Sequence, residues 1–178
     1  PGSLLLWHAW IALEVESGDR SKAVELCELA VRRFPHVASF CASWALLLKE
    51  AGDVVGARKV AKQGLAVDES CGLVWMALAT IERDDGDHWK ARQAYAAGAR
   101  KSRLSAVCNA VLARWAVMEL CLGEEARAQK LLTRAKAISG TQSADELLPA
   151  NVERCYEIAN DPYLARSALA VLVAGMNR

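Results

Sequence analysis

The sequence lacks long hydrophobic runs, contains little proline and has no excess of charge of either sign. Its longest apolar runs, such as 44–48 and 169–175, stop far short of the ~18 residues that a membrane-spanning helix needs. Proline contributes 4 of 178 residues, and 22 basic side chains face 21 acidic ones. These shortages exclude a collagen-like chain, a disordered chain and a strongly charged tail. We expect a folded soluble protein with its own core and no membrane partner.

Aromatic residues are also scarce, at 6% of the chain, yet more than half of them are tryptophan. The rest of the apolar composition is mostly alanine, leucine and valine, which favours helices over strands. Since tryptophan is too large to be a general filler of such a core, its positions need an explanation.

The six cysteines do not form closely spaced pairs, and most stand among apolar neighbours. This arrangement is typical of small buried side chains in a reducing compartment rather than of disulfides, a metal site or a catalytic thiol. The residues concerned are Cys27, Cys41, Cys71, Cys108, Cys121 and Cys155.

An internal repeat is the strongest pattern in the sequence. A Gly-Asp pair recurs every 34 residues, and related Gly-Glu and Asn-Asp pairs follow at intervals of 37. The first residues of these pairs are Gly18, Gly52, Gly86, Gly123 and Asn160. Five positions after each of them stands an alanine, namely Ala23, Ala57, Ala91, Ala128 and Ala165. Large residues precede the pairs at 8 or 11 positions, including Trp7, Trp10, Trp44, Trp75 and Trp115.

Each repeat predicts two helices joined by a tight turn. Segments 4–17, 38–51 and 72–85 carry apolar residues at the 3, 4 and 7 spacing of an amphipathic helix. The glycine supplies the left-handed backbone that ends this first helix, and the following aspartate caps the second helix. We expect the tryptophans to insert into depressions left by the recurrent small residues, with Trp89 outside this scheme and exposed.

Because no single hairpin can bury its own apolar face, the repeats must stack. The fold class predicted is all-α, a right-handed α-solenoid of about five antiparallel helix pairs. Four repeats are expected over 4–35, 38–68, 71–103 and 105–138. Residues 139–178 are expected to form an irregular fifth repeat that ends the solenoid, with an extra short helix near 143–148. Residues 1–3 are interpreted as a cloning remnant on an excised piece.

The chain resembles the tetratricopeptide repeat and, more closely, its HAT (half-a-TPR) variant. The first repeat has the Trp7, Trp10 and Glu14 set of a HAT unit, and Glu82 and Glu119 stand at the Glu14 position of later repeats. The characteristic Ala-Arg pair occurs as Ala57-Arg58, Ala91-Arg92 and Ala165-Arg166. Leu48 and Tyr156 depart from the pattern by replacing the glutamate.

This resemblance implies a function in RNA maturation, because HAT proteins as a family serve RNA processing and RNA stabilisation. It implies a non-catalytic scaffold in a multi-subunit assembly inside the cell, in the nucleus or alternatively in a chloroplast or mitochondrion. The alternative is a TPR-type adaptor that binds a peptide or helix in its concave groove, without any connection to RNA. The first helices of repeats one to three contain no asparagine, which argues against a clamp for C-terminal carboxylates.

No constellation of residues predicts catalysis, a cofactor or a metal. His8, His36 and His88 are scattered singly, and His8 is interpreted as a packing residue. Asp84, Asp85 and Asp87 straddle a helix end, where acids also cap helices. Glu82 and Arg92 are expected to pair across their own hairpin as a structural contact. The same structural interpretation applies to Glu14, Arg58 and the repeated tryptophans and glycines.

Two basic groups are the candidate contacts for single-stranded RNA. Arg127, Lys130 and Arg134 share one helical face, and Arg100, Lys101 and Arg103 end the third repeat. An ordinary solvated face is the alternative interpretation. The ends of the solenoid are candidates for self-association, since 4–6 and the apolar residues of 169–176 have no evident polar cover.

Overall fold

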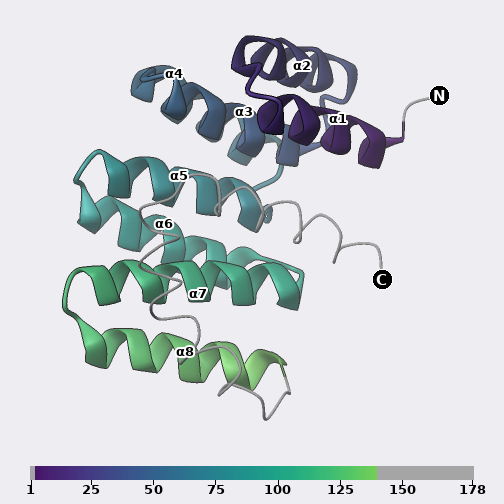
Figure 1. Ribbon diagram of the computed structural model, residues 1–178. Coiled ribbons are helices and arrows are strands. Elements are labelled where there is room, and N and C mark those ends of the chain that lie inside the picture. Colours follow the sequence, from purple (N-terminus) through teal and green to yellow (C-terminus); the bar gives the residue numbers. More distant parts are fainter. Residues whose placement is uncertain (1–2, 140–178) are drawn as a thin grey trace. The chain divides into compact units, whose positions relative to one another are not determined.

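The structure, a computed structural model, describes residues 3–139, which contain eight α-helices and no strand (Figure 1). The helices are α1 (Leu4–Glu16), α2 (Arg20–Arg33), α3 (Ala38–Glu50), α4 (Val54–Val67), α5 (Gly72–Asp84), α6 (His88–Lys101), α7 (Ser105–Cys121) and α8 (Glu125–Ser139). Each odd-numbered helix packs against the next even-numbered helix as a hairpin. The prediction of an all-α protein built of helical hairpins is therefore confirmed for these residues. The right-handed superhelix stays a prediction, and the fifth repeat with its short helix near 143–148 lies outside the described residues.

The chain divides into two compact units, with the boundary between Arg103 and Leu104. The first unit contains three hairpins, and the second contains the hairpin of α7 and α8. Within the first unit the hairpins stack in order, because α3 packs against α2 and α5 packs against both α3 and α4. Each hairpin there covers part of the apolar face of the next, as a helical repeat requires.

The turns inside the hairpins have the backbone that the repeat predicts. Gly18, Gly52, Gly86 and Gly123 all have φ between 76° and 89°, the left-handed region that favours glycine. A carboxylate begins the next helix in the first three hairpins, where an Asp side chain accepts a bond from the backbone N–H three residues later. These bonds join Asp19 to Lys22 at 3.0 Å, Asp53 to Gly56 at 2.8 Å and Asp87 to Lys90 at 3.0 Å.

The recurrent small residues lie where helices approach most closely. Ala23, Ala57 and Ala91 are fully buried. A methyl group added at Gly64 of α4 would lie 2.8 Å from Cβ of Cys41 and 3.2 Å from both methyls of Val74. These small side chains let the second helix of a hairpin approach the first helices on both sides.

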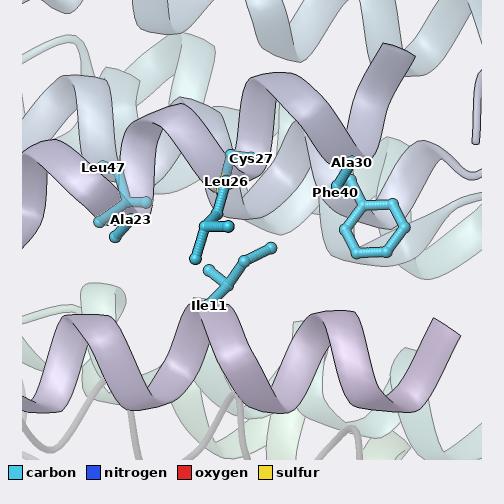
Figure 2. Packing of buried hydrophobic residues seen from close by; sticks show 7 residues of the cluster. All are labelled: Ile11, Ala23, Leu26, Cys27, Ala30, Phe40 and Leu47. Atoms are coloured by element: carbon cyan, nitrogen blue, oxygen red, sulfur yellow. The ribbon is translucent and has the colours of Figure 1, made fainter. Parts of the chain in front are cut away.

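The first two hairpins share a hydrophobic core. Figure 2 shows Ile11 of α1 projecting toward Leu26 and Cys27 of α2, with Phe40 near Ala30. Phe40 is fully buried, and Trp7, Phe34 and Trp44 lie at the edge of this cluster. Phe40 and Leu47 belong to α3, so the first hairpin is held to the second by one continuous core.

The tryptophans are not the buried knobs that the sequence suggests. Trp7, Trp44, Trp75 and Trp115 are only partly buried, and Trp10 is 45% exposed. The largest fully buried side chains are instead Tyr95, Phe40, Ile81, Leu112, Met118, Glu119, Val74, Val111 and Cys27. Three of the indoles donate their N–H to polar acceptors that a dry core does not offer: Trp10 to Glu14, Trp75 to the Glu69 carbonyl and Trp115 to Glu119. Trp89, expected outside the scheme, is 64% exposed.

Most of the described cysteines follow the prediction of small buried side chains. Cys27, Cys41 and Cys108 are buried free thiols, and burial raises the pKa of Cys27 to about 12. Cys121 is exposed, because it ends α7 beside the turn to α8. Cys155 lies outside the described residues.

His8 joins the first hairpin to the second. Its ring stacks on Phe40 with centroids 4.2 Å apart, and its Nε2 lies 3.0 Å from the Ser39 hydroxyl. Burial lowers the pKa of His8 below its ordinary value of 6.5, because a charged ring would lose water in this contact. The interpretation of His8 as a packing residue agrees with this position.

We expect the contact at His8 to weaken in mild acid. Since the unfolded chain has the higher histidine pKa, it takes up the proton first, and stability is lost as the pH falls below 6.5. Urea unfolding followed by tryptophan fluorescence between pH 7.5 and 5.5 measures this loss. His8→Leu should flatten the profile, and a variant that keeps the full slope would assign it to other groups.

Candidate functional site

The described residues offer no metal site and no membrane-spanning helix. Within 3–139, no three His, Cys, Asp or Glu side chains are arranged to hold a metal ion. No helix in that part of the chain is both long enough and apolar enough to cross a bilayer. The acidic residues around the third turn have structural partners: Lys49 pairs with Asp84 at 2.5 Å, Arg58 pairs with Asp85, and Asp87 caps α6.

A bidentate ion pair connects the second hairpin to the third. Arg58 of α4 donates to both oxygens of Glu82 in α5, at 3.0 and 2.9 Å. The Glu82 side chain is buried, and its hydrogen bonds raise the pKa of Arg58. The sequence predicts Arg92 of the same hairpin as the partner of Glu82, whereas the structure shows Arg58 of the preceding hairpin on both oxygens. The pair therefore fixes how hairpins stack, because Arg58 reaches forward from α4 to the face of α5 that packs on it.

A buried glutamate also recurs inside individual hairpins. Glu14 accepts the Trp10 indole N–H at 2.9 Å and lies 2.6 Å from the Lys22 ammonium, and these bonds lower its pKa. Glu119 likewise accepts the Trp115 indole N–H at 2.8 Å. In both hairpins the tryptophan binds a glutamate of its own helix, and that glutamate faces a basic residue of the following helix, Lys22 or Arg127.

The second hairpin lacks this arrangement. Leu48 replaces the glutamate, and Gly56 stands at the position of Lys22. The Trp44 indole N–H is consequently buried without an acceptor among the described residues. The glutamate and the lysine of the first hairpin are thus both replaced in the second, as expected if the two residues act as an ion pair.

The basic side chains predicted on α8 are exposed. Arg127, Lys130 and Arg134 lie on the solvent side of the helix. Arg127 also faces carboxylates, 3.9 Å from Glu119 and 3.7 Å from Glu124. Lys130 and Arg134 are therefore the freer cations of this group.

The second predicted basic group ends α6, in the other unit. Lys101 pairs with Glu69 and lies 5.4 Å from the centre of the Trp75 ring. Arg100 and Arg103 are exposed. Lys101 thus helps to hold α6 against the start of α5, and only the two arginines are open to a ligand.

Within the described part of the chain, one apolar face of α1 is left uncovered. Leu6 and Leu13 are 70% and 61% exposed, and Trp10 lies between them at the same helical face. In the second repeat, 34 residues later, the positions equivalent to Leu6 and Leu13 are Phe40 and Leu47. Both of these side chains are buried under the first hairpin. The exposed face of α1 is thus the equivalent of a surface that packs hairpin against hairpin elsewhere in this unit.

A basic stripe on α4 was not predicted. A shallow, open hollow of about 580 Å³ lies along this helix, and the described residues that line it are Val55, Arg58, Lys59, Lys62, Gln63 and Ala66. The net charge summed over a whole repeat hides the stripe, because acidic residues in the flanking segments cancel the positive charge of α4. Counting by helix would have found it, since α4 has three basic residues and no acidic one.

Neither a family model nor a curated protein matches this chain. The similarity to HAT and TPR repeats therefore rests on the residues and spacings given above.

Proposed function

We propose that this protein is a non-catalytic helical-repeat scaffold that holds other proteins in an assembly serving RNA processing or RNA stabilisation. The observation that supports the scaffold is the uncovered face of α1, with Leu6, Trp10 and Leu13 in the register of buried inter-hairpin surfaces. Such a face is stable when another helical surface covers it. The RNA-processing assembly is the extension that the HAT-like motifs suggest.

We expect the face of α1 to mediate concentration-dependent self-association when no other partner is present. Leu6→Ser combined with Leu13→Ser should leave a monomer, because the substitutions remove most of the apolar contact area. Light scattering coupled to gel filtration measures the mass. The matched control is Leu29→Ser, which changes another exposed leucine on α2. A monomeric wild-type protein at all concentrations contradicts self-association.

Direct RNA binding is a second candidate, supported by the exposed cations of α8. Replacing Lys130 and Arg134 by alanine should weaken the binding of single-stranded RNA about tenfold at low salt, and raised salt should weaken the wild type steeply. Gel shifts with mixed-sequence RNA at two salt concentrations test this. Binding that ignores salt, or that survives the substitutions, rejects the α8 surface.

The peptide-binding adaptor without a connection to RNA remains the alternative function. It predicts protein partners in a purification of the full-length protein, without any associated RNA.

A further inference from the structure

The second helices of the second and third hairpins are unusually one-sided in charge. Helices α4 and α6 together contain seven Lys and Arg residues and no Asp or Glu. The equivalent helix of the first hairpin, α2, carries Glu25 and Glu28. No acidic side chain within α4 or α6 therefore reduces the positive potential of these two helices.

Most basic residues in this unit are already paired, but two on α4 are not. Arg58 is bound to Glu82 and Asp85, and its neighbours along the helix, Lys59 and Lys62, are exposed. No ion pair to Lys59 or Lys62 is present among residues 3–139. The two ammonium groups are thus available to an acidic ligand, while Arg58 is held in place by the fold.

The shape of the stripe indicates an elongated partner. The residues that line the hollow on α4 stand 0, 3, 4, 7, 8 and 11 positions along the helix, from Val55 to Ala66. They follow one helical face for about three turns, roughly 16 Å. Val55 is 77% exposed at one end, and Trp89 occupies the equivalent position at the start of α6, 34 residues later. An exposed valine at the start of a lysine stripe provides an apolar anchor beside cationic flanks.

We propose that this face of α4 binds an acidic amphipathic helix of a partner protein. The partner's apolar side chains pack on Val55 and on the aliphatic stems of Lys59 and Lys62, and its carboxylates meet the two ammonium groups. Among residues 3–139, those that line the hollow include no aromatic ring on which a nucleic-acid base could stack, which favours a helix over RNA. The proposal rests on the scaffold function and specifies the chemistry of one of its partners.

The test uses a fluorescein-labelled 16-residue helical peptide with leucines along one face and glutamates flanking them. We expect the full chain to bind it by fluorescence anisotropy, and Lys59→Glu with Lys62→Glu to weaken binding at least about tenfold. Arg32→Glu with Arg33→Glu, which reverses the same charge on α2, should change affinity less than about twofold. Val55→Ser should also weaken binding, and circular dichroism checks that each variant is folded.

Two further probes distinguish the classes of ligand. A peptide with lysine in place of every glutamate should not bind, and equal binding of both peptides overturns the proposal. The second probe is a 15-nucleotide poly(U) RNA. The proposal is also overturned, in favour of a nucleic-acid ligand, if the acidic peptide fails to bind while the RNA binds to the wild type and not to the Lys59 and Lys62 variant. Self-association through α1 should persist in the Lys59 and Lys62 variant, so failure at α4 is distinguishable from failure of the scaffold function.

Discussion

Arg58→Ala should lower the free energy of unfolding of the first unit by about 3 kcal/mol, the largest effect we expect from removing a single ion-pair partner. The substitution leaves the Glu82 carboxylate buried without the guanidinium that binds both of its oxygens. A buried charge that loses its partner costs far more than an exposed ion pair contributes. Because Arg58 connects α4 to α5, the stacking of the second and third hairpins should weaken first.

Urea unfolding of Arg58→Ala, Glu82→Gln and the double variant forms a cycle that isolates this interaction. We expect the double variant to be less destabilised than the sum of the single changes. Lys59→Ala is the matched control, since it removes an exposed cation one residue away and should alter stability by no more than about 0.5 kcal/mol. An Arg58→Ala variant as stable as this control contradicts the structural role of the pair.

Gly64→Val should also destabilise the first unit, by about 2 to 3 kcal/mol. The first added carbon would lie 2.8 Å from Cβ of Cys41 and 3.2 Å from the methyls of Val74, so α4 cannot keep its distance from both α3 and α5. The better helix propensity of a residue other than glycine offsets only part of this cost.

The thermal midpoint of Gly64→Val, compared with that of Gln63→Val, measures the overpacking. Gln63 is the exposed neighbour on α4, so valine there tests the same side chain without the close contact. The double variant Gly64→Ala with Cys41→Gly should be less destabilised than the sum of the two single changes, because Cys41→Gly removes the Cβ that the new methyl meets. An unchanged midpoint for Gly64→Val would mean that the neighbouring helices separate at little cost.

The turns and helix starts could be predicted because the interactions that form them are local. A glycine followed by an aspartate determines a left-handed residue and a cap within four positions of the chain, and all three Gly-Asp turns show both features. Four of the five alanines that follow these pairs lie in the described residues, and all four are buried as predicted: Ala23, Ala57, Ala91 and Ala128. The amphipathic period places them on the buried side of the second helix, and Ala165 lies outside the described residues.

The candidate sites were less accessible to sequence reasoning. The cations of α8 could be found from their 3 and 4 spacing, but their electrostatic partners could not, as Arg127 shows. The sequence of α4 contains no acidic residue, so the basic stripe with Lys59 and Lys62 could have been found from the sequence. Only the structure shows that Arg58 is already paired with Glu82, which leaves the two lysines as the cations open to a ligand. The exposed face of α1 became informative only when its equivalents on α3 were seen to be buried.

The sequence by itself determined the hairpins, their turns and the positions of their small residues, since each depends on contacts within a few residues or on helical periodicity. Only the tertiary structure decided that the tryptophans lie at the rim, that Glu82 pairs with Arg58 of the preceding hairpin, and that aliphatic side chains, Phe40 and Tyr95 fill the core. The physical reason is that these contacts join different helices. Their geometry follows from how closely stacked hairpins approach, and Gly64, Cys41 and Val74 set that distance for the second and third hairpins.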